Sequence, residues 1–246
     1  MIEALIPILS AGGVTLPPEA LEKLEGYHAL LLQWNEKMDL TNVPEAEMPL
    51  RHYGDSLLPL ARGDWFPAGA SLIDVGTGAG FPGMALAIAR PDLRVTLLDA
   101  QRKRCDFLSA VREQLELENV RILHARAEDA ARTELREHFQ TAAARAVAPL
   151  NVLAEYLLPF VAPGGRALCW KGPALSQELP AGTRAAKLLG GEMEETLRLP
   201  IPEREHYVVP IRKMQKTDRR YPRKSGTPTR EPLGEAVEKA KTSENK

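Results

Sequence analysis

The stretch Asp74-Val75-Gly76-Thr77-Gly78-Ala79-Gly80-Phe81-Pro82-Gly83 decides the fold of this 246-residue chain. It follows the apolar strand pattern at 71–75 and precedes the helical pattern at 84–90. Four glycines stand within eight residues, whereas a tight turn needs only one or two. Because glycine lets the backbone approach a ligand closely, the loop predicts a binding site between a strand and a helix.

Strand and helix patterns alternate outward from this loop. The further strand patterns lie at 95–100, 120–125, 141–148 and 164–171, and the helical patterns lie at 103–117 and 151–160. Two more strand patterns, at 194–201 and 206–213, lie close enough in the chain to pair as antiparallel neighbours. This order predicts an α/β fold in which helices cover both faces of a mainly parallel sheet with an antiparallel edge.

The chain divides into three expected parts. Helical patterns at 17–37 and 48–60 predict an N-terminal helical extension, residues 1–62, that packs on the core. The α/β domain spans 63–213. Periodicity then vanishes, and residues 214–246 are expected to form a basic, largely irregular tail.

Composition excludes several classes of protein. With 44% hydrophobic and 26% charged residues, the chain can build a core, so wholesale disorder is excluded. No apolar run approaches the roughly 20 residues that cross a bilayer, and the N-terminus lacks a basic leader, so we expect a cytoplasmic protein without membrane contact. The two cysteines, Cys105 and Cys169, form neither a disulfide framework nor a metal clip, so no metal is expected.

The net charge of −1 hides an asymmetric distribution. Residues 212–230 hold eight Lys or Arg against one acidic residue, whereas the rest of the chain has 24 basic and 32 acidic residues. Such a segment is either a solvated tail or a surface for a phosphate-rich partner.

Two glycine frames overlap in the loop. The frame at 78–83 fits the G-x-G-x-x-G of dinucleotide enzymes, but it begins two residues late, and Pro82 removes an amide where donors are needed. The acid-x-Gly-x-Gly-x-Gly frame at 74–80 fits better. It resembles the first motif of class I S-adenosyl-L-methionine (AdoMet) methyltransferases, which have a Rossmann-like fold, and it predicts that Gly76 and Gly78 lie against the cofactor.

Acidic groups follow the next two predicted strands. Asp99 ends the second strand, 23 residues after Gly76, where an adenosine-binding βαβ unit needs an acceptor for the ribose hydroxyls. The third strand ends in the run 124–129, which contains acids suited to the adenine amine. Each carboxylate alone is more often a helix cap, but suitable groups at three successive strand ends favour a site.

The sequence lacks the motifs that two classes of methyl acceptor require. The fourth strand ends without the Asp/Asn-Pro-Pro-aromatic loop of adenine amino-group methylases, and neither cysteine follows a proline, as carbon-5 methylation of pyrimidines requires. A guanine N7 carries no proton and needs no general base, which suits a sequence without an obvious His-carboxylate pair, so no catalytic residue is assigned and positioning is the expected mechanism. Arg145, which ends this strand, is either a structural arginine or a partner of the cofactor's carboxylate.

The chain resembles the bacterial 16S rRNA (guanine-N7) methyltransferases, the glucose-inhibited division protein B family, over nearly its full length. The matching residues are Trp34-Asn35, Leu40-Thr41-Asn42-Val43, Arg51-His52, Asp55-Ser56-Leu57, the glycine loop, Leu98-Asp99-Ala100, Lys103-Arg104, Arg126-Ala127-Glu128, Arg145-Ala146, Trp170-Lys171-Gly172-Pro173 and Tyr221-Pro222-Arg223-Lys224. Asp39 departs from the pattern, because many members have Asn there.

The resemblance implies an enzyme that methylates N7 of a guanine in the decoding-region loop of 16S rRNA, on RNA or on the small ribosomal subunit. It implies that the AdoMet site is lined by Gly76, Phe81, Ala127, Glu128 and Arg145, with Asp99 at the ribose. The candidates for RNA contact are His52, Lys171, Arg223 and Lys224. His52 and Asp55 stand three residues apart on one helical face, which favours a local hydrogen bond over substrate contact, and Lys171 caps its strand or meets RNA.

Two other function classes remain open at this point. One is an NAD-dependent dehydrogenase, which the register of the glycine loop disfavours. The other is a noncatalytic rRNA-binding assembly factor on a methyltransferase scaffold. All expected cofactor residues lie between Asp74 and Arg145, so the tail is expected to take no part in cofactor binding.

Overall fold

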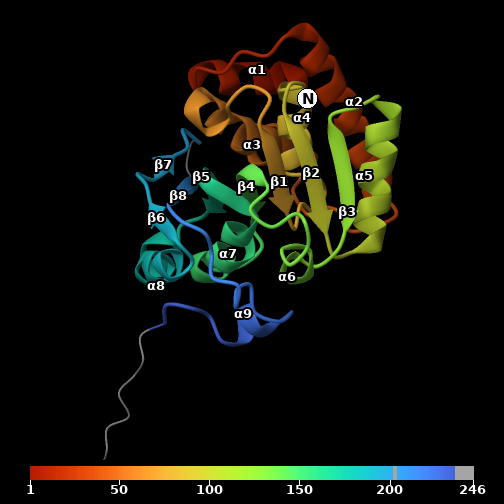
Figure 1. The fold of residues 1–246 in the computed structure, drawn as a ribbon. Helices are drawn as coiled ribbons and strands as arrows, with labels where there is room; N and C mark the ends of the chain where they lie inside the picture. Colours follow the sequence, from red (N-terminus) through yellow and green to blue (C-terminus); the bar gives the residue numbers. More distant parts are fainter. Residues whose placement is uncertain (202–203, 236–246) are drawn as a thin grey trace, which may run out of the picture.

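The computed structural model describes residues 1–201 and 204–235. A single sheet with strand order β3-β2-β1-β4-β5-β8-β6, and with β7 paired to β8, forms its centre (Figure 1). The strands are β1 (Ser71–Val75), β2 (Arg94–Asp99), β3 (Val120–His124), β4 (Phe139–Arg145), β5 (Val161–Lys171), β6 (Gly191–Met193), β7 (Leu197–Arg198) and β8 (Tyr207–Lys213). β1 to β5 pair in parallel, and β8 runs antiparallel to its three partners. The predicted mixed sheet with an antiparallel edge is confirmed.

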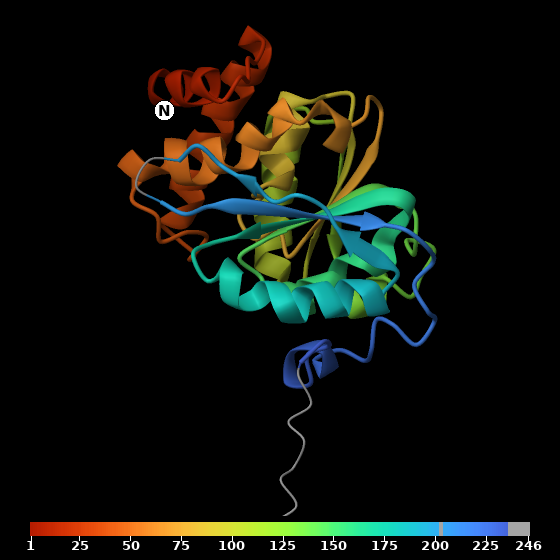
Figure 2. The same ribbon diagram turned by 90° about the vertical axis from the view of Figure 1, so that its left-hand side faces the viewer.

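Helices cover both faces of the sheet (Figure 2). The longer helices are α1 (Ile2–Ala11), α2 (Pro18–Asn35), α4 (Gly83–Ala89), α5 (Arg102–Gln114), α7 (Leu150–Leu157) and α8 (Leu175–Leu188), and η5 (Leu158–Phe160) extends α7. Leu72 and Leu97 face a core shared with α2, α4 and α5, whereas Ile73 and Leu98 face a second core shared with α7 and α8. Burial of both faces explains why β1 is apolar throughout except for Asp74 and Ser71.

The helix α8 has no counterpart among the sequence predictions. It contains Pro180 and Gly182, which both disfavour helices, so its pattern is weak. A Cβ on Gly182 would lie 2.6 Å from Leu150 Cδ2, so this glycine allows α8 to pack closely on α7. Tertiary packing therefore overrides a poor local propensity.

The N-terminal extension is more segmented than the predicted helix at 48–60. The chain instead forms short turns: η1 (Glu45–Glu47), the π-helical turn η2 (Pro49–Gly54), α3 (Asp55–Leu57), η3 (Leu58–Ala61) and η4 (Gly63–Trp65). The π-helical turn and α3 carry Arg51, His52 and Asp55 to the end of β4, where Arg145 bonds atoms of all three.

No described helix is long and apolar enough to cross a membrane.

The tail packs on the domain through its backbone carbonyls. Arg132 Nη2 donates to Pro222 O at 2.7 Å, and Arg136 Nη1 donates to Tyr221 O at 2.8 Å. Residues 214–235 are mostly irregular, with the short helix α9 (Thr227–Arg230) beside α7 and near α6 (Ala127–Ala130) in Figure 1. The rest of the predicted tail, 236–246, lies outside the described residues.

Candidate functional site

The carboxylate of Asp74 holds the glycine loop through hydrogen bonds. Its Oδ2 accepts hydrogen bonds from Thr77 Oγ1 at 2.6 Å and from Gly83 N at 2.8 Å, so one carboxylate ties together both ends of the loop. Burial raises the pKa of Asp74 to about 6, and these two hydrogen bonds partly offset the rise. The other oxygen, Oδ1, is buried and has no hydrogen-bond partner among the described residues, which leaves an acceptor for a ligand's donor.

The glycines of the loop are required by the chain's own geometry. Gly76 has φ of +68° and Gly80 has φ of +102°, a region in which other residues are strained. A Cβ on Gly76 would also lie 2.8 Å from Val147 Cγ2, in the loop that follows β4. The first and fourth strand ends therefore approach each other at Gly76.

Asp99 holds the adjacent strand end against the loop. It is 2% exposed, and its Oδ2 accepts from Gly78 N at 2.9 Å while its Oδ1 accepts from Gln101 N at 2.8 Å. The guanidinium of Arg104 lies 3.7 Å from Oδ2. A carboxylate has about four acceptor positions, so Asp99 keeps capacity for the ribose hydroxyls that the sequence assigns to it.

Glu128 connects the third strand end to the tail. It lies in α6 beside Ala127, it is 4% exposed, and its Oε1 accepts from Gly226 N at 2.8 Å. The tail therefore reaches a residue expected to bind the cofactor. No sequence signal links Gly226 to Glu128, so the sequence did not predict this contact of the tail.

Arg145 joins the end of β4 to the N-terminal extension. Its Nη1 donates to Asp55 Oδ2 at 2.8 Å and to Arg51 O at 2.9 Å, and its guanidinium carbon lies 5.1 Å from the centre of the Phe81 ring. Its Nη2 lies 3.2 Å from His52 Nδ1. Arg145 thus contacts both the N-terminal extension and the glycine-loop residue Phe81.

His52 is locked between neighbours. Its ring stacks on Phe81 with centroids 4.5 Å apart, and its Nε2 lies 2.7 Å from Thr41 Oγ1. Burial, followed by the nearby charge of Arg145, lowers the pKa of His52 to about 3, so the ring is neutral at physiological pH. Among the described residues, His52 and Asp55 bond Arg145 rather than each other.

A cavity of about 310 Å³ opens beside Arg145 at the carboxyl ends of β4 and β5. It is lined by Val43, Arg51, His52, Asp55, Arg145, Ala146, Trp170, Lys171, Gly172, Glu178 and His206. Lys171 Nζ forms an ion pair with Glu178 Oε2 at 2.6 Å and donates to Ala148 O at 3.0 Å. The structure therefore brings together His52 and Lys171, two of the candidates for RNA contact.

The cavity contains a pair that the sequence did not reveal. His206 Nδ1 lies 2.9 Å from Asp55 Oδ1 although the two residues are 151 positions apart. The fold therefore supplies a His-carboxylate pair that is not obvious in the sequence. Residues so far apart in the chain show no spacing pattern in the sequence. His206 reaches the cavity because β8, which begins at the next residue, pairs with β5.

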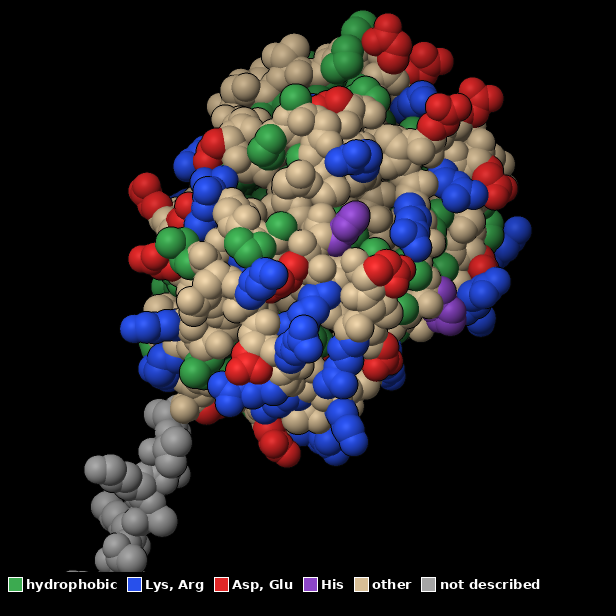
Figure 3. Space-filling model, in the orientation of Figure 1, with side chains coloured by type: hydrophobic (Ala, Val, Ile, Leu, Met, Phe, Trp, Pro, Cys, Tyr) green, Lys and Arg blue, Asp and Glu red, His purple; other side chains and the backbone are tan. Residues whose placement is uncertain are grey.

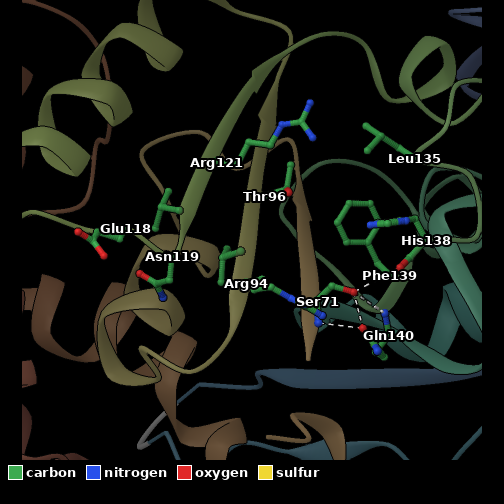
Figure 4. A pocket seen from close by; sticks show the side chains of 12 residues that line it. Ser71, Arg94, Thr96, Glu118, Asn119, Arg121, Leu135, His138, Phe139 and Gln140 are labelled. Atoms are coloured by element: carbon green, nitrogen blue, oxygen red, sulfur yellow. Dashed lines mark hydrogen bonds between the residues drawn. The ribbon is translucent and has the colours of Figure 1, made fainter. Parts of the chain in front are cut away.

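Another cavity, of about 440 Å³, lies at the opposite ends of the strands (Figure 4). Its lining includes Ser71, Arg94 and Val120, which are the first residues of β1, β2 and β3. Ligands of open parallel sheets bind at the carboxyl ends of the strands. The carboxyl ends of the strands, which carry Asp74, Asp99 and Arg145, are therefore the candidate site.

Comparison with known proteins decides the identity. A family model described as "GidB: rRNA small subunit methyltransferase G" matches residues 20–207. The chain belongs to the GidB family. It is 43% identical to ribosomal RNA small subunit methyltransferase G of Leuconostoc mesenteroides, over 94% of this chain and 98% of that protein. The same protein of Bacillus cytotoxicus is 42% identical over the same shares.

Solved structures agree on the fold of this GidB chain. The 16S rRNA (adenine(1408)-N(1))-methyltransferase of Catenulisporales acidiphilia, solved with SAM, superposes with a TM-score of 0.50 and 19% identity, covering 61% of this chain and 88% of that one. MtNAS in complex with S-adenosylmethionine gives 0.52 and 15%, covering 78% and 75%. The predicted class I methyltransferase fold is confirmed. The chain is an AdoMet-dependent 16S rRNA methyltransferase, so the dehydrogenase alternative is wrong.

The strand ends of this GidB chain fit AdoMet. Asp74 Oδ1 is a buried acceptor without a partner among the described residues, Asp99 has acceptor positions left, and the glycine loop presents its backbone beside them.

Among the described residues, no group of three His, Cys, Asp or Glu side chains could hold a metal ion.

The basic tail of this GidB chain is partly engaged internally. The Arg223 side chain donates to both oxygens of the buried Glu155, with Nη2 to Oε2 at 2.7 Å and Nε to Oε1 at 3.0 Å, and this pairing raises the pKa of Arg223. Lys213 is buried and donates to Leu158 O. The exposed cations of the segment include Lys216, Arg219, Arg220, Lys224 and Arg230. Lys and Arg gather on the lower part of the face in Figure 3, where Figure 1 places α6 and α9.

Proposed function

We propose that the chain transfers the methyl group of AdoMet to N7 of a guanine in the decoding-region loop of 16S rRNA. The observation that carries the proposal is the meeting of two sites at Arg145, Phe81 and His52: the glycine loop with its strand-end carboxylates on one side, and the 310 Å³ cavity on the other. One site suits the cofactor and the other suits a base turned out of its RNA strand.

The chemistry of the available groups favours a ring nitrogen. Burial raises the pKa of Cys169 to about 12 and also raises that of Cys105, so neither thiol supplies the thiolate that carbon-5 methylation needs. His52 is neutral and held by Thr41 and Arg145, which removes it as a free base. N7 of guanine attacks with its own lone pair, and no proton has to leave it first.

The residues of the chain act by positioning. AdoMet, when bound, supplies a methyl group on a positively charged sulfur. In the proposed site Gly76, Gly78 and Phe81 line the cofactor and Asp99 accepts from its ribose. Ala127 and Glu128 meet the adenine, and Arg145 pairs with the carboxylate of the methionine part. Holding donor and acceptor in line at roughly 3–3.5 Å lowers the barrier without acid or base catalysis.

The proposed RNA contacts come from two regions. His52 and Lys171 line the cavity, whereas Arg223 and Lys224 belong to the tail. Of these, Lys224 is exposed, and Arg223 is held by Glu155. Lys224 therefore suits a phosphate contact, whereas the role of Arg223 is to fix the tail backbone beside it. The substrate is either 16S rRNA alone or the small ribosomal subunit.

The test is methyl transfer from labelled AdoMet to 16S rRNA and to small subunits, followed by identification of the modified nucleoside. We expect 7-methylguanosine, and we expect no transfer to RNA in which 7-deazaguanosine, which has carbon in place of N7, occupies the target position. Methylation of the 7-deaza substrate, or a different modified nucleoside, would overturn the proposal.

The His206–Asp55 pair provides a second test of a mechanism without a base. If His206 removed a proton, the ratio of the single-turnover methylation rates of His206→Gln and wild type would change with pH. We expect the mutant and wild-type rates to keep a constant ratio from pH 6 to pH 9. A ratio that changes with pH would assign His206 a role in proton transfer.

A further inference from the structure

We propose that the Lys171–Glu178 ion pair recognises the base in the cavity, with Lys171 donating to guanine O6 and Glu178 accepting from guanine N1–H. This inference rests on the proposed function, and it assigns the selection of guanine over adenine to two named side chains.

The pair is built into the end of the sheet. Lys171 is the last residue of β5, Glu178 lies in the first turn of α8, and both line the cavity. Their side chains are 10% and 20% exposed, and the ammonium and carboxylate lie 2.6 Å apart. A rigid donor beside a rigid acceptor is thus presented to whatever enters the cavity.

Backbone groups of the β4–α7 connection hold both charges in place. Lys171 Nζ donates to Ala148 O at 3.0 Å, and Glu178 Oε2 accepts from Leu150 N at 2.6 Å. An ammonium has three donors, so Lys171 retains one after bonding Ala148 and Glu178. Glu178 Oε1 accepts no hydrogen bond from the described residues and is not fully buried, so it is available to a base.

Among the described residues, Glu178 is the cavity carboxylate with one oxygen, Oε1, that accepts no hydrogen bond. Asp55 is 2% exposed, and its two oxygens are already bonded to Arg145 and to His206. The Asp55 carbonyl also accepts from Trp170 Nε1 at 2.9 Å. Asp55 therefore organises the wall of the cavity, whereas Glu178 keeps Oε1 available to a ligand.

The donor and acceptor pattern of the pair matches guanine. Guanine places the acceptor O6 next to the donor N1–H, because both atoms are attached to the same ring carbon. Adenine places a donor amino group and an acceptor N1 at these two positions, which would set donor against donor and acceptor against acceptor. A site of this kind rejects the wrong base through unpaired polar groups as well as through lost hydrogen bonds.

The same contact leaves N7 uncovered. O6 lies between N1 and N7 on the edge of the purine, so a base held through O6 and N1 keeps the N7 lone pair unobstructed. Arg145 lines the cavity and also lies 5.1 Å from the ring of Phe81 in the glycine loop. Recognition through O6 and N1–H therefore leaves N7 free to face the cofactor side.

Glu178→Gln tests the acceptor. The amide oxygen of the mutant can keep the bond from Leu150 N and the contact with Lys171, which turns the amide NH₂ toward guanine N1–H. We expect kcat/KM for guanine RNA to fall about 10- to 100-fold and the preference for guanine over adenine at the target position to shrink by a similar factor. AdoMet affinity should stay at the wild-type value, since Glu178 lies outside the cofactor side. Glu113→Gln, in an exposed pair with Arg112 at the far end of α5, is the matched control.

Base analogues test the same inference in the unmodified enzyme, so the answer does not depend on a mutant that folds. Inosine keeps O6, N1–H and N7 and lacks only the 2-amino group, so RNA with inosine at the target should be methylated at close to the guanine rate. 2-Aminopurine lacks O6 and has an acceptor at N1, so its rate should fall at least about 10-fold.

The outcomes separate the two proposals. If wild type methylates 7-deazaguanine RNA, the proposed function fails whatever the analogues show. If wild type forms 7-methylguanosine but accepts 2-aminopurine as well as inosine, or if Glu178→Gln keeps the wild-type preference for guanine, the assignment of Lys171 and Glu178 is overturned while the function stands.

Discussion

A side chain at Gly76 would be unfavourable for two separate reasons, backbone strain and a steric clash. Its φ of +68° costs another residue about 1–3 kcal/mol, and a Cβ would lie 2.8 Å from Val147 Cγ2. We expect Gly76→Ala to weaken AdoMet binding, measured by calorimetry on folded protein. Adding Val147→Ala removes the steric clash but not the strain, so the double mutant should recover only part of the affinity. Wild-type affinity in Gly76→Ala would refute the placement of the cofactor at this loop.

Asp74 makes the stability depend on pH. Its pKa is about 6 in the folded chain and 3.8 in the unfolded chain, so between these values the folded state binds more protons. Stability should therefore fall as pH rises from about 4 to about 6, by a total of about 3 kcal/mol, and the loss should persist at higher pH.

The measurement is urea unfolding of wild type and Asp74→Asn across pH 4 to 8. The amide can accept from Thr77 and Gly83 as the carboxylate does, but it does not titrate. His52 acts in the opposite direction, because its lowered pKa of about 3 makes stability rise between about pH 3 and pH 6.5, its unperturbed value. The difference between the two curves therefore isolates Asp74, and a difference that does not vary with pH would contradict the prediction.

At the scale of the elements, sequence patterns predict the parallel half of the sheet well because its strands are short apolar runs with turn residues between them. They fail where packing outweighs propensity, as in α8 with Pro180 and Gly182. They also fail for contacts over long separations. Asp99 and the acidic run 124–129 were predicted from their places after strands, but Glu178 and His206 reach the cavity, and Gly226 reaches Glu128, only through the completed fold.

The tail is attached to α7 by one dominant ion pair. Glu155 is fully buried, and both its oxygens accept from Arg223. Removing one partner of a buried pair typically costs about 3–5 kcal/mol, and Arg223 is partly exposed, so Arg223→Ala should lower the free energy of unfolding by about 3 kcal/mol. Replacing both residues with Leu should restore part of this loss.

Arg102→Ala provides the surface comparison for Arg223. Arg102 is 75% exposed in its pair with Asp106, and pairs of this kind are worth about 0–1 kcal/mol. Urea unfolding of both mutants makes the comparison. Equal losses in the two would show that the tail is not anchored through Glu155.

At the scale of the whole molecule, the charge distribution predicts a salt dependence of RNA binding. Arg219 and Lys224 are exposed in the tail, and neither contacts the proposed cofactor residues. If each meets a phosphate, replacing both with Gln should reduce the slope of log affinity against log salt by about 1.4–1.8, with unchanged AdoMet affinity. The matched control replaces Arg94 and Arg121, exposed at the opposite edge of the sheet, and should leave the slope unaltered. Identical slopes for the tail mutant and wild type would locate the RNA surface elsewhere.

The position of β8 between β5 and β6 sets an order for assembly during synthesis. β6 and β7 leave the ribosome before β8, yet in the described structure both enter the sheet by pairing with β8. The five parallel strands can therefore come together while the chain is still growing, whereas the antiparallel edge must wait for residues 207–213. His206 directly precedes that strand and Gly226 follows it, so the 310 Å³ cavity lacks His206, and Glu128 lacks its bond from Gly226, until β8 and the segment after it have been synthesised. A chain that stops before β8 would therefore keep the parallel strands and lose one wall of the cavity.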